Sequence, residues 1–161
     1  MLRLIPKPLH RVLLIQAHRV RLVWWRIRKP TLLGCRVLAF DGAGRVLLVR
    51  HSYGSGRWLL PGGGIAEGEL PLQAALRELA EETACALEDP RELAVIEEPL
   101  AGTTNRVHVI TGRARGVPQG DGREIIAAQF FALDALPTNL AQQLQRHLAD
   151  WVAQARTSTQ S

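Results

Sequence analysis

The sequence predicts an α+β domain in which a β-sheet lies between helices, that is, an α/β/α sandwich. The chain has 161 residues, which is the size of one ordinary domain. With 47% hydrophobic and 22% charged residues, its composition is that of a globular protein. Strand patterns precede, interrupt and follow one central helix pattern, and this order favours helices packed on a sheet. No uncharged stretch reaches the roughly 18 residues that a membrane-spanning helix needs.

The basic residues are concentrated at the N-terminus. Residues 1–30 contain eight lysines and arginines and no acidic residue. The rest of the chain then holds 12 basic and 15 acidic residues, a net charge of −3, although the whole chain carries +5. We therefore expect a mildly acidic domain at residues 31–156, for which nucleic acid is an unfavourable partner.

Residues 1–30 also carry apolar side chains at helical spacing, from Leu9 to Ile27, and Pro30 ends the pattern. The sequence thus predicts a basic amphipathic N-terminal helix. One interpretation, slightly favoured, is a helix that packs on the domain or on a second copy in a homodimer. The other is an arginine-rich helix on an anionic membrane surface, with Trp24 and Trp25 near the lipid headgroups.

Short β patterns begin at Gly34. Residues Cys35–Phe40 and Arg45–His51 are rich in valine and leucine, and the DGAG turn at 41–44 between them predicts a hairpin. A short strand at Trp58–Leu60 runs into the glycine-rich residues 61–64.

One helix and a second group of strands follow. Pro71 suits a first helical turn, and the apolar spacing after it predicts a helix over Pro71–Thr83. Further strands are expected at Leu93–Glu97, Arg106–Arg113 and Ile125–Leu133. Leucines from Leu140 to Leu148, with Trp151 and Val152, predict a closing helix, and residues 157–161 read as a polar tail.

Three glutamates on the central helix carry the strongest chemical signal. Glu78, Glu81 and Glu82 stand at i, i+3 and i+4, so their carboxylates share one helix face. Such like charges repel unless a cation lies between them, and ligands that are all oxygen favour Mg²⁺ or Mn²⁺. The alternative is an acidic helix face exposed to solvent.

The residues before these glutamates strengthen the metal interpretation. Gly62, Gly63 and Gly64 let the backbone approach a phosphate or offer a carbonyl to a cation. Glu69 lies eight residues before Arg77, so the pair could tie this loop to the helix, although a surface ion pair of about 0–1 kcal/mol is the simpler explanation.

Residues Gly63–Cys85 together resemble the Nudix box, with the pattern G-x5-E-x7-R-E-U-x-E-E-x-G-U, in which U is a bulky aliphatic residue. The matching positions are Gly63, Glu69, Arg77, Glu78, Leu79, Glu81 and Glu82. Two residues depart from the pattern: Ala84 replaces the last glycine and Cys85 a larger aliphatic residue. An alanine in a left-handed helix end costs about 1 kcal/mol, unless the helix ends differently.

The resemblance implies a Nudix sandwich with a mixed β-sheet and a hydrolase that cleaves a diphosphate with Mg²⁺ or Mn²⁺. It implies Glu78 and Glu82 as metal ligands, and Glu81 as a further ligand or the catalytic base. Arg77 and Glu69 would hold these carboxylates in register. The Gly62 carbonyl could complete the metal ligands, and Glu124 is the candidate carboxylate from outside the box.

The substrate is expected to be a nucleoside diphosphate derivative or another nucleotide. Residues before and within the glycine segment could contact its phosphates or stack on its base. These candidates are Arg50, His51, Tyr53, Arg57, Trp58, Gly62 and Gly63, with a core position equally plausible for Trp58.

Other functions remain open from the sequence alone. They are pyrophosphohydrolysis of RNA 5′ ends, a non-catalytic module that senses a nucleotide, and a membrane-surface adaptor acting through residues 1–30. Only two cysteines are present, which suits a reducing compartment, so we expect a cytoplasmic protein, at the inner membrane surface if residues 1–30 bind lipid.

Overall fold

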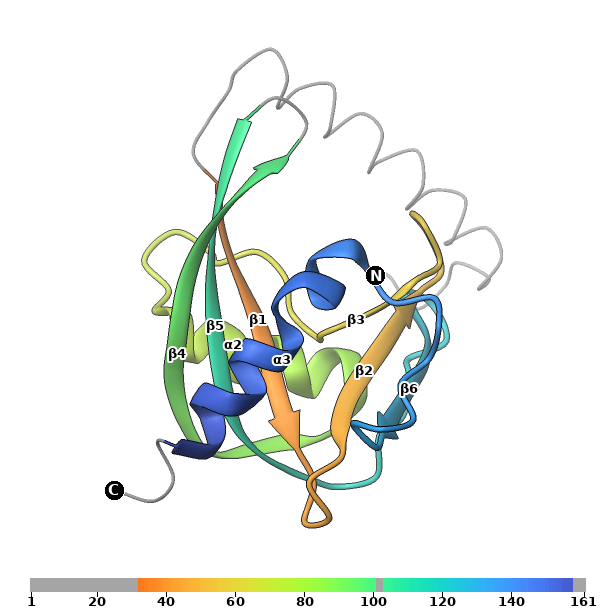
Figure 1. Cartoon of the computed structure of the whole chain (residues 1–161). Helices are drawn as coiled ribbons and strands as arrows, with labels where there is room; N and C mark the ends of the chain where they lie inside the picture. The colour runs from red at the N-terminus through yellow and green to blue at the C-terminus, as the bar shows by residue number, and fades with distance from the viewer. Residues whose placement is uncertain (1–31, 101–102, 158–161) are drawn as a thin grey trace.

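The computed structural model describes residues 32–100 and 103–157 (Figure 1). The predicted basic helix at 1–30 and residues 158–161 of the predicted tail lie outside the described residues. The described strands are β1 (Leu32–Phe40), β2 (Val46–His51), β3 (Trp58–Leu59), β4 (Ala86–Leu100), β5 (Thr103–Arg115) and β6 (Ile125–Phe131). The described helices are α2 (Pro71–Thr83) and α3 (Gln142–Thr157).

The strands form one mixed sheet in the order β3-β2-β1-β5-β4, with β6 also paired to β2. β1 runs parallel to β5, and the other neighbours are antiparallel. β1 and β2 pair only at Phe40 and Val46, next to the hairpin, so the two strands diverge beyond that point. This divergence leaves one edge of β1 free for another segment of the chain.

The predicted hairpin between β1 and β2 is confirmed. Asp41 Oδ1 accepts hydrogen bonds from the backbone N–H groups of Ala43 and Arg45, at 3.0 and 2.9 Å. An aspartate that bonds to backbone two and four residues later fixes a tight turn.

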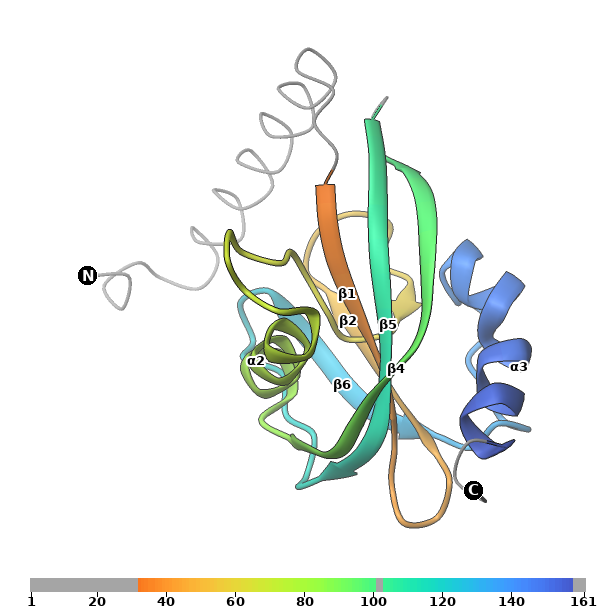
Figure 2. The ribbon, with the colours of Figure 1, turned by 90° about the vertical axis from the view of Figure 1, so that its left-hand side faces the viewer.

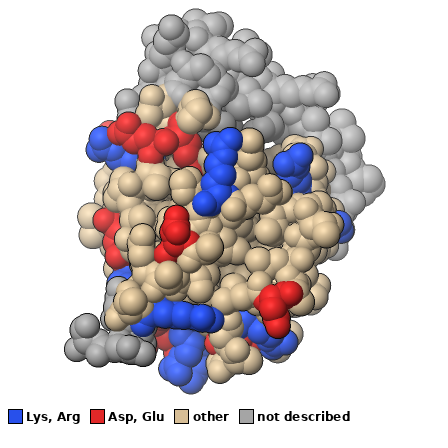
Figure 3. Space-filling model, viewed as in Figure 1, with Lys and Arg blue, Asp and Glu red and all other residues tan. Residues whose placement is uncertain are grey.

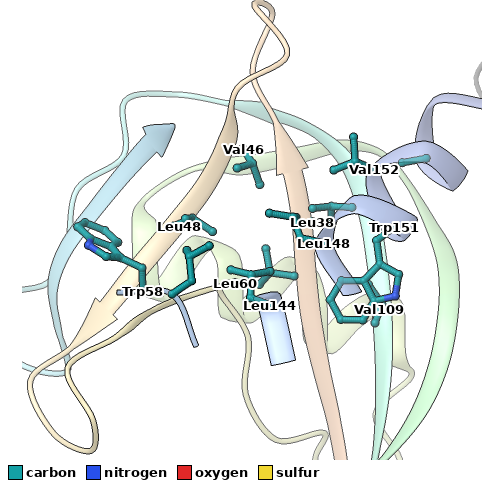
Figure 4. Packing of buried hydrophobic residues seen from close by; sticks show 12 residues of the cluster. Leu38, Val46, Leu48, Trp58, Leu60, Val109, Leu144, Leu148, Trp151 and Val152 are labelled. Carbon is teal, nitrogen blue, oxygen red and sulfur yellow. The ribbon is translucent and has the colours of Figure 1, made fainter. Parts of the chain in front are cut away.

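Helices α2 and α3 lie on opposite sides of the sheet (Figure 2), and one core cluster lies on each side, which confirms the predicted sandwich. The side chains of β1 alternate, so that Cys35 and Val37 pack in the cluster on the α2 side, whereas Leu38 packs on the α3 side. Figure 4 shows this second cluster, in which Leu144, Leu148 and other α3 residues meet the sheet.

β4 and β5 are longer than the sequence predicted, since they pair from Ala86 and Arg115 to the far end of the hairpin. Two register shifts interrupt the ladder, between Glu88 and Arg91 and just after Glu92. Each extra residue reverses the side-chain alternation, so the period-2 pattern that marks a strand is lost there. The helix predicted at Pro71–Thr83 is confirmed in full.

Candidate active site

The glycine segment lies along the edge of β1 that β2 leaves free. The backbone N–H groups of Val37 and Cys35 donate to the carbonyl oxygens of Pro61 and Gly63, at 2.8 and 2.9 Å. The segment therefore pairs with β1 much as a strand would. This pairing places its backbone between β1 and the second half of helix α2, where Glu78 and Glu82 lie.

Gly62 leaves no room for a larger residue, and a larger residue at Gly63 would displace the Glu78 carboxylate. Gly62 has φ +145°, and a Cβ there would collide with the carbonyl oxygen of Cys35. A Cβ on Gly63 would lie 2.5 Å from Glu78 Oε1. The absence of side chains therefore lets the backbone approach the box carboxylates directly.

Glu82 is the buried carboxylate of the site, with 7% of its surface exposed. Its Oε2 accepts the N–H of Gly62 at 2.9 Å, and its Oε1 lies 3.8 Å from His51 Nε2. The pKa of Glu82 is raised to about 8, mainly by burial and to a lesser extent by the charges of Glu78 and Glu124. The Gly62 N–H and, more weakly, the charge of Arg36 oppose this increase of the pKa.

Arg77 connects the loop before the helix with the box glutamates. Its Nε and Nη2 donate to the two carboxylate oxygens of Glu69 at 2.8 and 2.9 Å. Its Nη1 donates to Glu78 at 2.7 Å and to Glu81 at 3.4 Å, and Nη2 also donates to the Gly64 carbonyl at 3.1 Å. The Arg77 guanidinium lowers the pKa of Glu69 to about 2. The predicted tie between loop and helix is thus present as a bidentate pair.

The carboxylates offer oxygen donors of the kind that a hard divalent cation prefers. Within residues 32–100 and 103–157, no three acidic, histidine or cysteine side chains are close enough together to form a metal-binding group. Glu78 and Glu81 both turn an oxygen to Arg77, which balances their charge. Glu82 instead stays buried beside Gly62, with its second oxygen toward His51.

Glu124, predicted from outside the box, lies close enough to Glu82 for its charge to raise the pKa of that residue. Two backbone hydrogen bonds hold this position at the start of β6. Ser52 N–H donates to the Glu124 carbonyl at 2.8 Å, and the Glu124 N–H donates to Asp121 Oδ1 at 3.0 Å.

A cavity of about 840 Å³ opens beside the glycine segment. The predicted residues that line it are His51, Tyr53, Arg57, Gly62, Gly63 and Glu69. Arg36 and Asn105 also line it and were missed from the sequence. Arg36 could have been noticed as the one charged residue in β1, whereas the position of Asn105 follows only from the pairing of β5 with β1.

Arg50 and Trp58, predicted to contact substrate, are not among the residues that line this cavity. Trp58 is 9% exposed and packs edge-on against Phe131, with ring centroids 4.8 Å apart. The Arg50 guanidinium lies 5.5 Å from the centre of the Trp58 ring, because the two residues are cross-strand partners. Trp58 therefore has the core position that the sequence left open (Figure 4).

Ala84 takes the conformation usual for the glycine that it replaces. It has φ 58° and ψ 14°, and its N–H donates to the Ala80 carbonyl at 3.0 Å. The helix therefore ends in the left-handed form in spite of the side chain. Cys85, the other departure from the box, is 1% exposed and fills the core on the α2 side.

Comparisons with known proteins find relatives in sequence and in fold. The RNA pyrophosphohydrolase of Teredinibacter turnerae is 44% identical over 61 residues, which are 38% of this chain and 36% of that protein. The match thus spans about a third of the length of this curated relative. The structure of a MutT NUDIX hydrolase from Burkholderia pseudomallei is 30% identical, with a TM-score of 0.67, over 74% of this chain and 97% of that one.

The NUDIX domain of Shewanella oneidensis NrtR, solved in complex with ADP ribose, is 25% identical, with a TM-score of 0.64. That match covers 81% of this chain and 90% of the other.

Among the described residues, no helix is long and apolar enough to cross a membrane. The family model of the NUDIX domain matches residues 30–152. Because this match spans most of the chain, the protein belongs to the Nudix family.

Proposed function

We propose that the protein is a divalent-metal-dependent pyrophosphohydrolase that cleaves the diphosphate of a nucleoside diphosphate derivative or another nucleotide. One observation carries the proposal: the buried Glu82, bonded to Gly62, stands beside a cavity of about 840 Å³ and near the charges of Glu78 and Glu124. If Glu82 is ionised, it is a buried carboxylate near Glu78 and Glu124, and a bound cation would stabilise that charge.

The donor set fits Mg²⁺ or Mn²⁺, because every candidate ligand is an oxygen. Glu78 and Glu82 would hold the ion, with Glu81, Glu124 or the Gly62 carbonyl as further ligands. A bound divalent ion would neutralise charge on the diphosphate and lower the pKa of the attacking water.

The protein's own residues have separate tasks in this proposal. Arg77, held by Glu69, keeps Glu78 and Glu81 oriented, and Glu81 is the candidate base because its side chain is 62% exposed. Gly62 and Gly63 let the phosphates approach the backbone. His51, Tyr53 and Arg57 are the candidate contacts to the rest of the substrate, since they line the cavity.

A panel of nucleotides incubated with and without Mg²⁺ tests the proposal, with products separated by chromatography. We expect turnover that needs Mg²⁺ and falls at least about a hundred-fold in Glu82→Gln. Glu97→Gln is the matched control, because it removes an exposed carboxylate that pairs with Arg106 on the sheet. Binding of a nucleotide without any turnover would instead favour a non-catalytic sensor.

The 5′ end of RNA is a second candidate substrate, favoured by the name of the curated relative. The net charge of −3 on residues 31–161 disfavours a long nucleic acid. On the face drawn in Figure 3, acidic and basic side chains are interspersed and form no continuous basic surface. A 5′-triphosphorylated RNA in the same panel distinguishes the two substrates. We propose a cytoplasmic location, because Cys35 and Cys85 are both free and buried thiols.

A further inference from the structure

Arg36 is a charged residue in an otherwise apolar strand. On β1 its neighbours Cys35 and Val37 point to the α2 side, so alternation directs Arg36 to the α3 side. Its Nη1 donates to the backbone carbonyl of Cys35 at 3.0 Å. Among the residues that the structure describes, no acidic side chain forms an ion pair with it. Partial burial of an arginine without an acidic partner is unfavourable, so a ligand that supplies negative charge would stabilise it.

The position of Arg36 relative to the candidate metal ligands suggests what that ligand is. Gly62 lies against the Cys35–Arg36 backbone, and its N–H donates to Glu82 on the α2 side. The glycine segment therefore lies between the Arg36 backbone and Glu82, and its residues Gly62 and Gly63 line the same cavity as Arg36. A phosphate that lies against the glycine backbone on the cavity side would thus lie in the cavity that Arg36 also lines.

The charges in the cavity favour a ligand with an additional negative group. Arg36 and the exposed Arg57 both line the cavity, and neither forms an ion pair with a described acidic residue. Two acidic residues also line it: Glu69, which is paired with Arg77, and Glu67, which is exposed to solvent. A terminal phosphate monoester carries roughly −1.5 to −2 at pH 7, whereas the same phosphate esterified to a sugar carries only one charge.

We propose that Arg36 is a specificity-determining residue that binds a terminal phosphate monoester, so that the site favours nucleoside polyphosphates over sugar-linked diphosphates. The inference rests on the proposed function, because it assumes that the glycine segment and the carboxylates hold the neighbouring phosphate. The Arg36 guanidinium is suited to the task, since its planar donors match two phosphate oxygens.

ADP and ADP-ribose are matched probes, because they differ only in whether ribose esterifies the terminal phosphate. Titration calorimetry with Ca²⁺, with chromatography to verify intact ligands, measures their affinities for the full chain. We expect the wild type to bind ADP about ten-fold more tightly. Arg36→Gln should lose most of this preference, with ADP weakened about ten-fold and ADP-ribose changed less than about three-fold.

Two further variants control the result. Arg36→Lys keeps the charge but not the planar donors, so it should retain part of the preference for ADP. Arg106→Gln removes an arginine from outside the cavity and should leave both affinities unchanged. If Arg36→Gln does not fold, the wild type still tests the inference, because salt should weaken ADP binding more than ADP-ribose binding.

Equal losses for both ligands in Arg36→Gln would overturn the inference and give Arg36 a structural role beside Glu82. Unchanged preference in that variant would overturn it as well. Binding of ADP that depends on Arg36, in a protein without turnover of any nucleotide, would support Arg36 while refuting the proposed function. Turnover of a nucleotide, together with an unchanged preference for ADP in Arg36→Gln, would support the proposed function and overturn the inference about Arg36.

Discussion

Replacing Glu82 with glutamine should make the protein more stable at alkaline pH while removing its activity. The folded-state pKa of Glu82 is raised from the ordinary 4.5 to about 8 by burial and by the charges of Glu78 and Glu124. A raised carboxyl pKa gives stability that is present below pH 4.5 and is lost as the pH rises to 8. At 1.36 kcal/mol for each pH unit in that interval, the loss is at most about 5 kcal/mol without bound metal. The amide of the Glu82→Gln variant would keep an oxygen for the Gly62 N–H and would not ionise.

Urea unfolding in EDTA at pH 5 and pH 9 measures this difference in the free energy of unfolding. From pH 5 to pH 9, the free energy of unfolding of the wild type should fall by several kcal/mol more than that of Glu82→Gln. The exposed Glu97→Gln variant is the control for the removal of one carboxylate. Mg²⁺ should stabilise the wild type at pH 9 more than the glutamine variant. Equal pH dependence of wild type and Glu82→Gln would refute the claim that Glu82 is a buried carboxyl group under electrostatic strain.

Three other changes test separate parts of the structure. Arg77→Ala should lower turnover about 10- to 100-fold and weaken Mg²⁺ binding, measured by calorimetry, because Glu78 and Glu81 lose their support; unchanged Mg²⁺ affinity would point to direct phosphate contact by Arg77. Ala84→Gly should add about 1 kcal/mol of stability and raise Tm by about 2–4 °C in calorimetric scans, because φ is 58° there; a lower Tm would show that the left-handed end is not strained. Deleting residues 1–30 should leave kcat within a few-fold, because every proposed metal ligand lies at or beyond Gly62 and every proposed substrate contact at or beyond Arg36. Vesicle sedimentation at low and high salt then tests lipid binding, and a large fall in Tm without lipid binding would favour packing or a dimer.

Features that depend on local spacing could be predicted from the amino-acid sequence. Helix α2, the hairpin at Asp41 and the tie between Glu69 and Arg77 follow from residues close together in the chain. The box glutamates share a helix face because of the 3.6-residue period alone. The end of the helix at Ala84 could be predicted as well. The sequence did not show whether Ala84 adopts the strained left-handed conformation or the helix ends in another way.

How those residues meet the rest of the chain depended on the three-dimensional arrangement. The burial of Glu82 requires the glycine segment to fill the edge of β1 that β2 leaves free, and this in turn requires β1 and β2 to diverge. Trp58 points into the core because it pairs with Arg50 across two strands, and Arg36 faces the cavity because of the direction of β1 alternation. Such properties arise from contacts between distant segments, and residue spacing within one segment carries no information about which segment will lie beside it.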